Sequence, residues 1–299
     1  MRIGLINQLN GSPDGPQPAP TWESISERAS VAEAVGFDSF VFEDALLYRD
    51  EESSRGCWES VSIGAALAST TSHIEIGPSV FNPPYRSPAL LAKIAETIDE
   101  ISGGRFIFGI GAGNTPNDYE AFGFATDHRY SRFAEAIEII HGLLKNGTVD
   151  YAGEYHSARN AELVLRGPRP QGPPIIIAAK GPRMLRLVAR YADGWNWWTT
   201  DHRSAMETLR PIVEELEGAC AEVGRDPATL RRSLDLYAVD PLSRAGDDES
   251  VLTGTAEEIG GALLAFAALG FDEIRCDVYP KTVEGIEAMK DIVDLVHAG

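Results

Sequence analysis

The sequence has few cysteines and no long hydrophobic run. Its 299 residues include three cysteines, Cys57, Cys220 and Cys276, and their wide separation matches neither a metal site nor a redox motif. No apolar run reaches the roughly 18 residues that a membrane span requires. The N-terminal residues, Met1 to Asn7, are strand-like and lack the apolar core and cleavage site of a signal peptide. These absences predict a cytoplasmic protein with reduced thiols and no membrane segment.

Basic residues are also scarce. Lysine and arginine total 26 against 45 aspartates and glutamates, which gives a formal net charge of −19. Because phosphate binding needs a basic surface, this balance argues against nucleic acid as a general partner. It leaves room for an anionic small ligand wherever a few cations converge locally. The hydrophobic share of 43% is ordinary for a globular chain.

Several catalytic patterns are missing. The six histidines show no metal-binding pair such as His-x-His or His-Glu-x-x-His, so no metal centre is expected. There is no Gly-x-Ser-x-Gly elbow and no cysteine with a histidine nearby in sequence, so no sequence motif supports nucleophilic hydrolysis. An unrelated aldolase barrel would need an activated lysine, and Lys180 alone is weak evidence for one.

A repeated strand–helix pattern fills the chain. Each of eight short apolar runs precedes a helical segment, and no low-complexity linker divides them. Eight such units predict an α/β fold, a (β/α)8 TIM barrel formed by one domain over residues 1–299, with a doubly wound sheet as the alternative. A β-hairpin insertion is expected near 148–165. The predicted strands are 3–6, 39–42, 74–80, 105–110, 174–178, 194–198, 233–239 and 272–278.

Helices are expected after the fourth and the last of the predicted strands. The fourth is expected from about Tyr130 to Leu144, and the last from Val283 to Val296. The segments 45–56, 119–130 and 201–203 carry no clear periodicity and are expected to be loops that shape substrate binding.

The third strand ends in the most informative segment. The apolar run from Ile74 meets a cluster of Gly, Pro, Ser and Asn up to Pro88, and a helical pattern begins at Ala89. Ligand sites of parallel α/β folds lie where strands end and helices begin. After the second strand, Glu43 and Asp44 form a carboxylate pair that either moves protons or belongs to a solvated loop.

Three further strand ends are candidates for ligand contact. Segment 109–117 is glycine-rich and is either an anion cradle or a tight turn. The turn with Lys180 and Arg183, which opens a helix at Pro182, is either a phosphate seat or an ordinary connection. Trp195, Trp197 and Trp198 either wall a flat ligand or pack in the core. The residues alone leave these alternatives open.

Taken together, these blocks resemble the bacterial luciferase-like superfamily of flavin- and deazaflavin-dependent oxidoreductases. The similarity is strongest in 77–105, in 109–117 and in 174–195. It implies a (β/α)8 barrel with an insertion region, usually dimeric, and a non-prolyl cis peptide at Ser79–Val80 that supports the middle ring of the cofactor. It also implies a set of cofactor-binding residues: Asp44, Ser79, Val80, Asn82, Ala112, Gly113 and Asn117 around the ring and its side chain, and Ala179, Lys180, Gly181, Arg183 and Met184 at the phosphate end.

Within the superfamily the spacing is most similar to the branch that uses coenzyme F420. Two departures argue against the sugar-phosphate dehydrogenases of that branch: Ala45 stands where they have a catalytic histidine, and Asn114 where they have a catalytic glutamate. Glu43 is then the candidate proton donor or acceptor, and Asn114 the candidate for orienting a substrate carbonyl. The acidic tail of F420 favours converging cations, for which Lys180, Arg183 and Arg86 are candidates.

The expected activity is hydride transfer between F420 and a small organic substrate. The alternatives are an FMN-dependent monooxygenase, which receives reduced flavin from a separate reductase and reacts with oxygen, and a non-catalytic flavin-binding relative. The same barrel would serve each of them.

Overall fold

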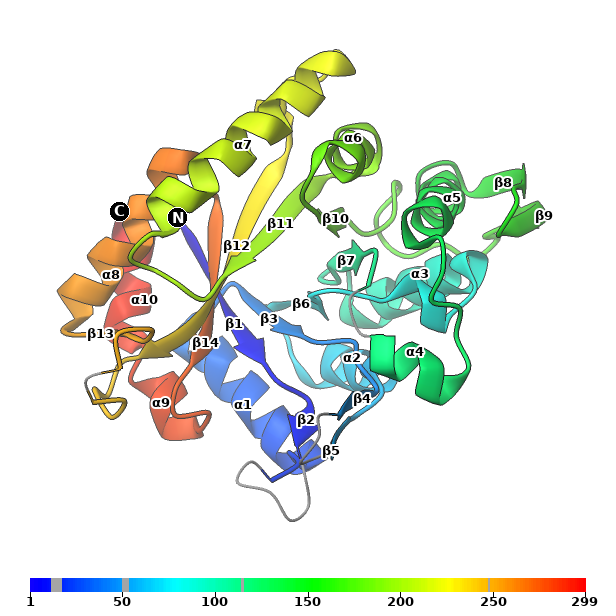
Figure 1. Ribbon diagram of the computed structural model, residues 1–299. Coiled ribbons are helices and arrows are strands. Elements are labelled where there is room, and N and C mark those ends of the chain that lie inside the picture. The colour runs from blue at the N-terminus through cyan, green and yellow to red at the C-terminus, as the bar shows by residue number, and fades with distance from the viewer. Residues whose placement is uncertain (12–17, 50–53, 114–115, 247) are drawn as a thin grey trace.

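A computed structural model describes the chain except for residues 12–17, 50–53, 114–115 and 247. Parallel strands surround a central axis and helices cover them on the outside (Figure 1). The strands of this barrel are β1 (Arg2–Asn7), β3 (Ser39–Phe42), β6 (Glu75–Pro78), β7 (Phe108–Gly111), β10 (Ile175–Ala178), β11 (Gly194–Thr199), β12 (Arg231–Asp240) and β14 (Glu273–Val278). The predicted (β/α)8 barrel is confirmed.

Strand order runs β6-β3-β1-β14-β12-β11-β10-β7, with the short β13 (Leu252–Thr253) paired to β12. The two ends of this order meet through backbone bonds. Ile76 N–H donates to the carbonyl of Arg105 at 3.1 Å, and Phe81 N–H donates to that of Gly109 at 2.9 Å. The barrel is therefore closed at the β6–β7 junction, where the third and fourth strands follow each other in sequence.

The helices cover the barrel because each turns an apolar face toward the strands. In α3, for example, Leu91, Ala95 and Ile98 are buried, and Gly103 ends the helix in the left-handed conformation. The α-helices are α1 (Trp22–Val35), α2 (Ser60–Thr70), α3 (Pro88–Ser102), α4 (Pro116–Phe122), α5 (Arg129–His141), α6 (Pro182–Tyr191), α7 (Ala205–Glu222), α8 (Ala256–Ala265), α9 (Val283–Glu287) and α10 (Lys290–Ala298).

Two predicted helices are wrong in extent. The fourth ends at His141 and continues as a π-turn, Gly142–Asn146. The last is two helices, because the chain leaves helical hydrogen bonding after Glu287 and buries Met289 before α10 begins. Among the described helices, none has the length and apolar character needed to cross a membrane.

Two small sheets lie outside the barrel. β2 (Asn10–Gly11), β5 (Ser54–Cys57) and β4 (Leu47–Arg49) form an antiparallel sheet, and β4 and most of β5 fall in segment 45–56, for which a loop is predicted. β8 (Thr148–Ala152) pairs antiparallel with β9 (Ser157–Glu162), within the segment 148–165 where a hairpin is expected.

A network of charged side chains lies near the N-terminal ends of the barrel strands. Glu273 is fully buried and pairs with Arg275 at 3.1 Å and with Arg231 at 2.9 Å. Ser39 donates a hydrogen bond to the same carboxylate at 2.7 Å. These cations hold the pKa of Glu273 down to about 2 although burial alone would raise it. This network separates the floor of the barrel from its mouth.

Candidate active site

Ser79 and Val80 lie half-buried at the mouth, directly after β6. The peptide bond between them is cis, as predicted. Ser79 N–H donates to the carbonyl of Phe42 at 2.7 Å, and its hydroxyl donates to Asp235 Oδ2 at 2.7 Å. Ser79 is thereby tied to β3 on one side and to β12 across the barrel.

Glycines let β7 approach this segment. A Cβ on Gly109 would lie 2.0 Å from the carbonyl oxygen of Pro78, and one on Gly111 would lie 2.8 Å from Cγ2 of Val80. Neither glycine has a left-handed φ, so the requirement is for space and not for backbone freedom. Close packing therefore accounts for Gly109 and Gly111, and neither the anion cradle nor the tight turn predicted for this segment explains these two glycines.

Glu43 follows β3 and lies half-buried at the mouth. Its Oε1 accepts hydrogen bonds from the Leu9 amide at 2.8 Å and from Asn10 Nδ2 at 2.7 Å. Its Oε2 accepts a hydrogen bond from the hydroxyl of Tyr48 at 2.6 Å. Burial and the neighbouring Glu43 both raise the pKa of Tyr48, so the tyrosine stays protonated. The two side chains form a hydrogen-bonded acid–tyrosine pair.

Asp44 points away from open space. It is buried, and its carboxylate accepts hydrogen bonds from Ser60 at 2.6 Å and from both Nη atoms of Arg86 at 2.8 and 3.0 Å. The amide of Asn82 donates to it at 2.8 Å, and Asn82 is itself buried. Asp44 therefore supports the loop after β6 from behind.

Arg86 is consequently engaged within the protein, and the sequence-based prediction that it is available to an acidic tail is wrong. Its guanidinium binds Asp44 and also Glu59, which accepts at 2.6 Å. Hydrogen bonds to both carboxylates raise the pKa of Arg86 further, against the opposing effect of burial.

The turn after β10 remains accessible. Lys180 is exposed, with its Nζ 5.3 Å from the ring centre of Trp197, and Arg183 lies over the ring of Tyr130 at 3.7 Å. Gly181 has φ 80°, and a Cβ added to it would meet no heavy atom of the described residues within 4 Å. Within that part of the chain no side chain caps α6. The first N–H groups of α6 can thus bind an anion between two cations.

The remaining members of this predicted set lie around that turn and around the end of β7. Ala179 is buried and its carbonyl accepts Trp195 Nε1 at 2.8 Å, while Met184 packs against the core. Ala112 and Gly113 are half-buried, and the Gly113 carbonyl accepts Arg129 Nη1 at 3.0 Å. Asn114 and the side chain of Asn117 lie outside the described residues.

Asp277, near the end of β14, is a site residue that sequence reasoning missed. Its Oδ2 accepts Gln8 Nε2 at 3.1 Å and pairs with Lys281 Nζ at 3.1 Å, whereas its Oδ1 is buried with no hydrogen-bond partner among the described residues. Burial raises the pKa of Asp277, and Lys281 opposes that effect. Alternation along the strand places Glu273, Arg275 and Asp277 on one face, but only the register of β14 with its neighbours shows that this face points inward.

Tyr237 on the neighbouring strand completes this side of the mouth. Burial raises its pKa, as do Asp235 and Asp277. A bulge interrupts the β12–β14 register there, and Ala238 adopts φ 65°; bulges of this kind re-aim side chains near functional sites.

The tryptophans divide between core and mouth. Trp198 is 47% exposed and meets Tyr237 edge-on at 6.1 Å, while Trp195 is fully buried against Phe271. Trp195 is thus a core residue, and Trp198 can wall a ligand.

Comparison with known proteins agrees with the barrel fold described above. A family model described as luciferase-like monooxygenase matches residues 1–239. The chain is 41% identical over 264 residues to a 5,10-methylenetetrahydromethanopterin reductase of Archaeoglobus fulgidus, covering 88% of this chain and 72% of that protein. It is 30% identical over 232 residues to an F420-dependent hydroxymycolic acid dehydrogenase of Mycobacterium tuberculosis, covering 76% and 61%.

A solved structure supports the fold. An F420-dependent secondary alcohol dehydrogenase in complex with an F420–acetone adduct superimposes with a TM-score of 0.82 at 19% identity, over 99% of this chain and 98% of that one. The barrel and the family match define the class: the chain belongs to the luciferase-like monooxygenase family.

Proposed function

We propose that this protein is an F420-dependent oxidoreductase that transfers a hydride between the deazaflavin and a small organic substrate at the barrel mouth. Two features of the mouth, taken together, are the observation that supports it most strongly. Within the described residues, the same mouth holds an uncapped helix N-terminus flanked by Lys180 and Arg183, and a buried carboxylate oxygen, Oδ1 of Asp277, without a partner. The first fits a phosphate and the second fits a ligand donor group.

The residues present fit the cofactor in two places. Val80, Ala112 and Gly113 border the mouth where the ring would lie, and the start of α6 would hold its phosphate. Bound there, F420 supplies a carbon that accepts or donates a hydride. The protein's part is to orient the substrate against it and to exclude water, for which Trp198 and Tyr237 form a wall.

Proton transfer is assigned to the side of the mouth near β3. Glu43 accepts a hydrogen bond from the hydroxyl of Tyr48 at 2.6 Å, and the pair can relay a proton to or from a substrate oxygen. We retain Asn114 as the residue that orients a substrate carbonyl. Asp277 is added as an acceptor for a substrate hydroxyl or N–H group.

A second candidate function is an FMN-dependent monooxygenase supplied with reduced flavin by a separate reductase. The description of the matching family favours it. The non-catalytic relative stays as a third candidate, because Ala45 and Asn114 stand where the sugar-phosphate dehydrogenases have a catalytic histidine and a catalytic glutamate. We also propose that the protein is a cytoplasmic homodimer.

Parallel titration of the apo-protein with F420 and with FMN, followed by cofactor fluorescence, tests the proposal. Micromolar binding of F420 with no binding of FMN is expected. Binding of FMN alone would replace the proposal by the monooxygenase, and tight F420 binding with no turnover on any reductant or substrate panel would favour the non-catalytic relative.

A further inference from the structure

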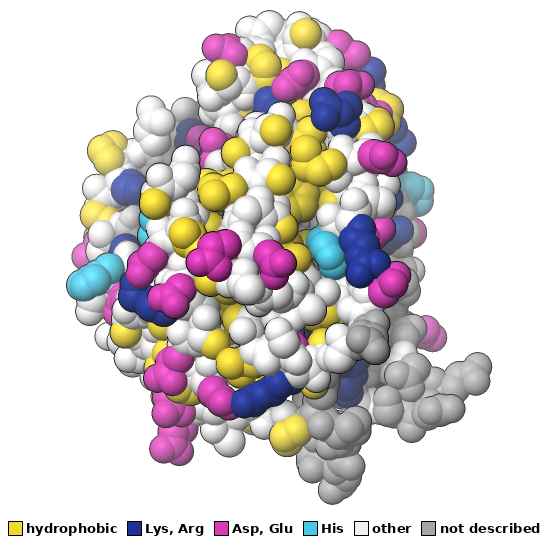
Figure 2. Space-filling model, turned by 90° about the vertical axis from the view of Figure 1, so that its left-hand side faces the viewer, with side chains coloured by type: hydrophobic (Ala, Val, Ile, Leu, Met, Phe, Trp, Pro, Cys, Tyr) yellow, Lys and Arg dark blue, Asp and Glu magenta, His cyan; other side chains and the backbone are white. Residues whose placement is uncertain are grey.

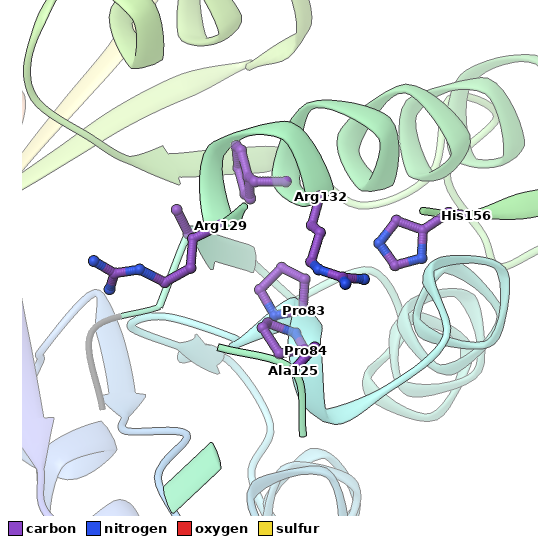
Figure 3. A pocket seen from close by; sticks show the side chains of 8 residues that line it. Pro83, Pro84, Ala125, Arg129, Arg132 and His156 are labelled. Atoms are coloured by element: carbon purple, nitrogen blue, oxygen red, sulfur yellow. The ribbon is translucent and has the colours of Figure 1, made fainter. Parts of the chain in front are cut away.

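A pocket lies beside the barrel mouth, between the start of α5 and the 3-10 turn Pro83–Tyr85 (Figure 3). It encloses about 390 Å³ together with its open entrance. Pro83, Pro84 and Phe133 give it an apolar lining, and Ala112 joins it to the end of β7. Ala112 is also one of the residues expected to contact the cofactor, so the pocket and the proposed cofactor site share a wall.

Two arginines line this pocket. Arg129 is exposed and uses one Nη atom on the carbonyl of Gly113, and within the described residues no further hydrogen bond occupies its other donors. Arg132 lies over the ring of Tyr155 at 4.6 Å and pairs with Asp127 at 3.0 Å. In Figure 3 its guanidinium lies beside His156.

The charges around the pocket favour an anion. Burial lowers the pKa of His156, so it is neutral near pH 7. Glu135 already accepts hydrogen bonds from three backbone N–H groups, those of residues 154–156. Asp127 pairs with Arg132 and offsets its charge, but it does not pair with Arg129. Arg183, stacked on the ring of Tyr130, adds a further cation on the path from α6. The surroundings of the pocket are thus richer in cations than the chain as a whole, whose net charge is −19.

The face that carries α8 and α10 is mixed. Acidic side chains are spread over it among apolar and basic ones (Figure 2). The net charge of −19 would repel a polycarboxylate in general, so a local cluster of cations is needed to attract it.

We propose that the Arg129–Arg132 pocket binds the acidic tail of the cofactor. The inference rests on the proposed function. Arg183 of α6 lies over the ring of Tyr130, which follows Arg129 in α5, so the start of α6 and the arginine side of the pocket are neighbours. Methylene groups of glutamyl units can lie on the rings of Pro83 and Pro84, while guanidinium groups bind their carboxylates in a forked geometry.

The test compares two deazaflavins by fluorescence titration: F420 with several glutamates, and the tail-free deazaflavin nucleoside phosphate. Arg129→Gln and Arg132→Gln are each expected to weaken binding of the tailed form about three- to tenfold and to reduce its salt dependence. Binding of the tail-free form should not change. Arg159→Gln is the matched control, because Arg159 is 67% exposed on the hairpin and pairs only loosely with Asp150 at 3.7 Å.

Each outcome decides a separate point. Equal affinity of the unaltered protein for tailed and tail-free forms overturns the tail site and leaves the proposed function standing. Failure to bind either form overturns the proposed function. Loss of affinity for both forms in the arginine variants would show that these residues shape the ring site, which also overturns the tail site. Arg129 is exposed, so its variant stays informative even if Arg132→Gln does not fold.

Discussion

Asp277 and Glu43 are two carboxylates at one barrel mouth, and the fold uses their oxygens differently. Both oxygens of Glu43 accept hydrogen bonds from the protein, whereas Oδ1 of Asp277 accepts none from the described part of the chain. A buried, unpaired oxygen costs free energy unless a ligand supplies a donor. This difference separates a proton-holding role for Glu43 from a ligand-accepting role for Asp277.

Asp277→Asn should increase stability and impair function. Burial raises the pKa of Asp277, so the ionised form is disfavoured in the folded state and its removal relieves that cost at pH 7. We expect a gain of about 1 kcal/mol, or roughly 2 °C in Tm. Thermal unfolding measures this, and a parallel loss of kcat/KM on any active substrate is expected. A loss of stability with full activity would contradict the assigned role.

Glu43→Gln should abolish one limb of the pH profile of turnover. The amide has a single acceptor oxygen and cannot take a proton, so kcat should fall by about 10²-fold or more while F420 affinity stays the same. Tyr48→Phe is the paired variant that removes the hydroxyl alone. Full turnover with an unchanged pH profile in Glu43→Gln would refute the acid–base role.

At the scale of elements, the β6–β7 junction closes the barrel through glycine. Gly109→Ala would place a methyl group 2.0 Å from the Pro78 carbonyl oxygen. That contact is with backbone and cannot be relieved by a rotamer change, so a loss of about 3 kcal/mol or more in the free energy of unfolding is expected. Gly218→Ala is the control, because none of the described residues lies within 4 Å of its Cβ position in α7. It should stabilise by roughly 0.5–1 kcal/mol.

Urea unfolding of both variants tests this account. Equal stabilities of Gly109→Ala and the unaltered protein would show that β7 can move away from Pro78 at little cost.

The elements that could be predicted from sequence are those with a strong local pattern. β3, predicted at 39–42, is observed at Ser39–Phe42, since its run is uniformly buried. The small sheet of β2, β4 and β5 could not be found, because its polar strands are fixed by distant groups: Asp118 accepts the amides of Leu46 and Leu47. Side-chain contacts of that range leave no local pattern.

The candidate site was predictable to a similar degree. Glu43, Ser79 and Lys180 do lie at the mouth, since strand ends in a parallel barrel share one face. The enclosure of Asp44 by Arg86 could not be predicted, because the pair joins segments 42 residues apart. Asp277 could not be found from local pattern alone, because the inward face of β14 depends on its register with β1 and β12.

For the whole molecule, the charged barrel floor predicts sensitivity to acid. The folded-state pKa of Glu273 is held near 2, below the ordinary value of 4.5. A carboxylate with a depressed pKa contributes stability above its unfolded pKa, and that contribution is lost as the pH falls from 4.5 toward 2. Urea unfolding across this range should show a steep decline in the free energy of unfolding.

Glu273→Gln should flatten that decline. It should also destabilise the protein at pH 7 by roughly 3–5 kcal/mol, because Arg231 and Arg275 lose their buried partner. Glu222→Gln, which breaks the exposed pair with Arg186, is the control and should change little. The same pH dependence in the unaltered protein and in Glu273→Gln would assign the acid sensitivity to other groups.

The central claim is that the barrel mouth is a deazaflavin site. A crystal structure of the protein with F420 tests it most directly. The account predicts the ring at the mouth between Val80 and Tyr237, with its phosphate on the N–H groups that begin α6. A ring bound elsewhere, or a mouth filled by side chains with F420 at saturating concentration, would contradict it.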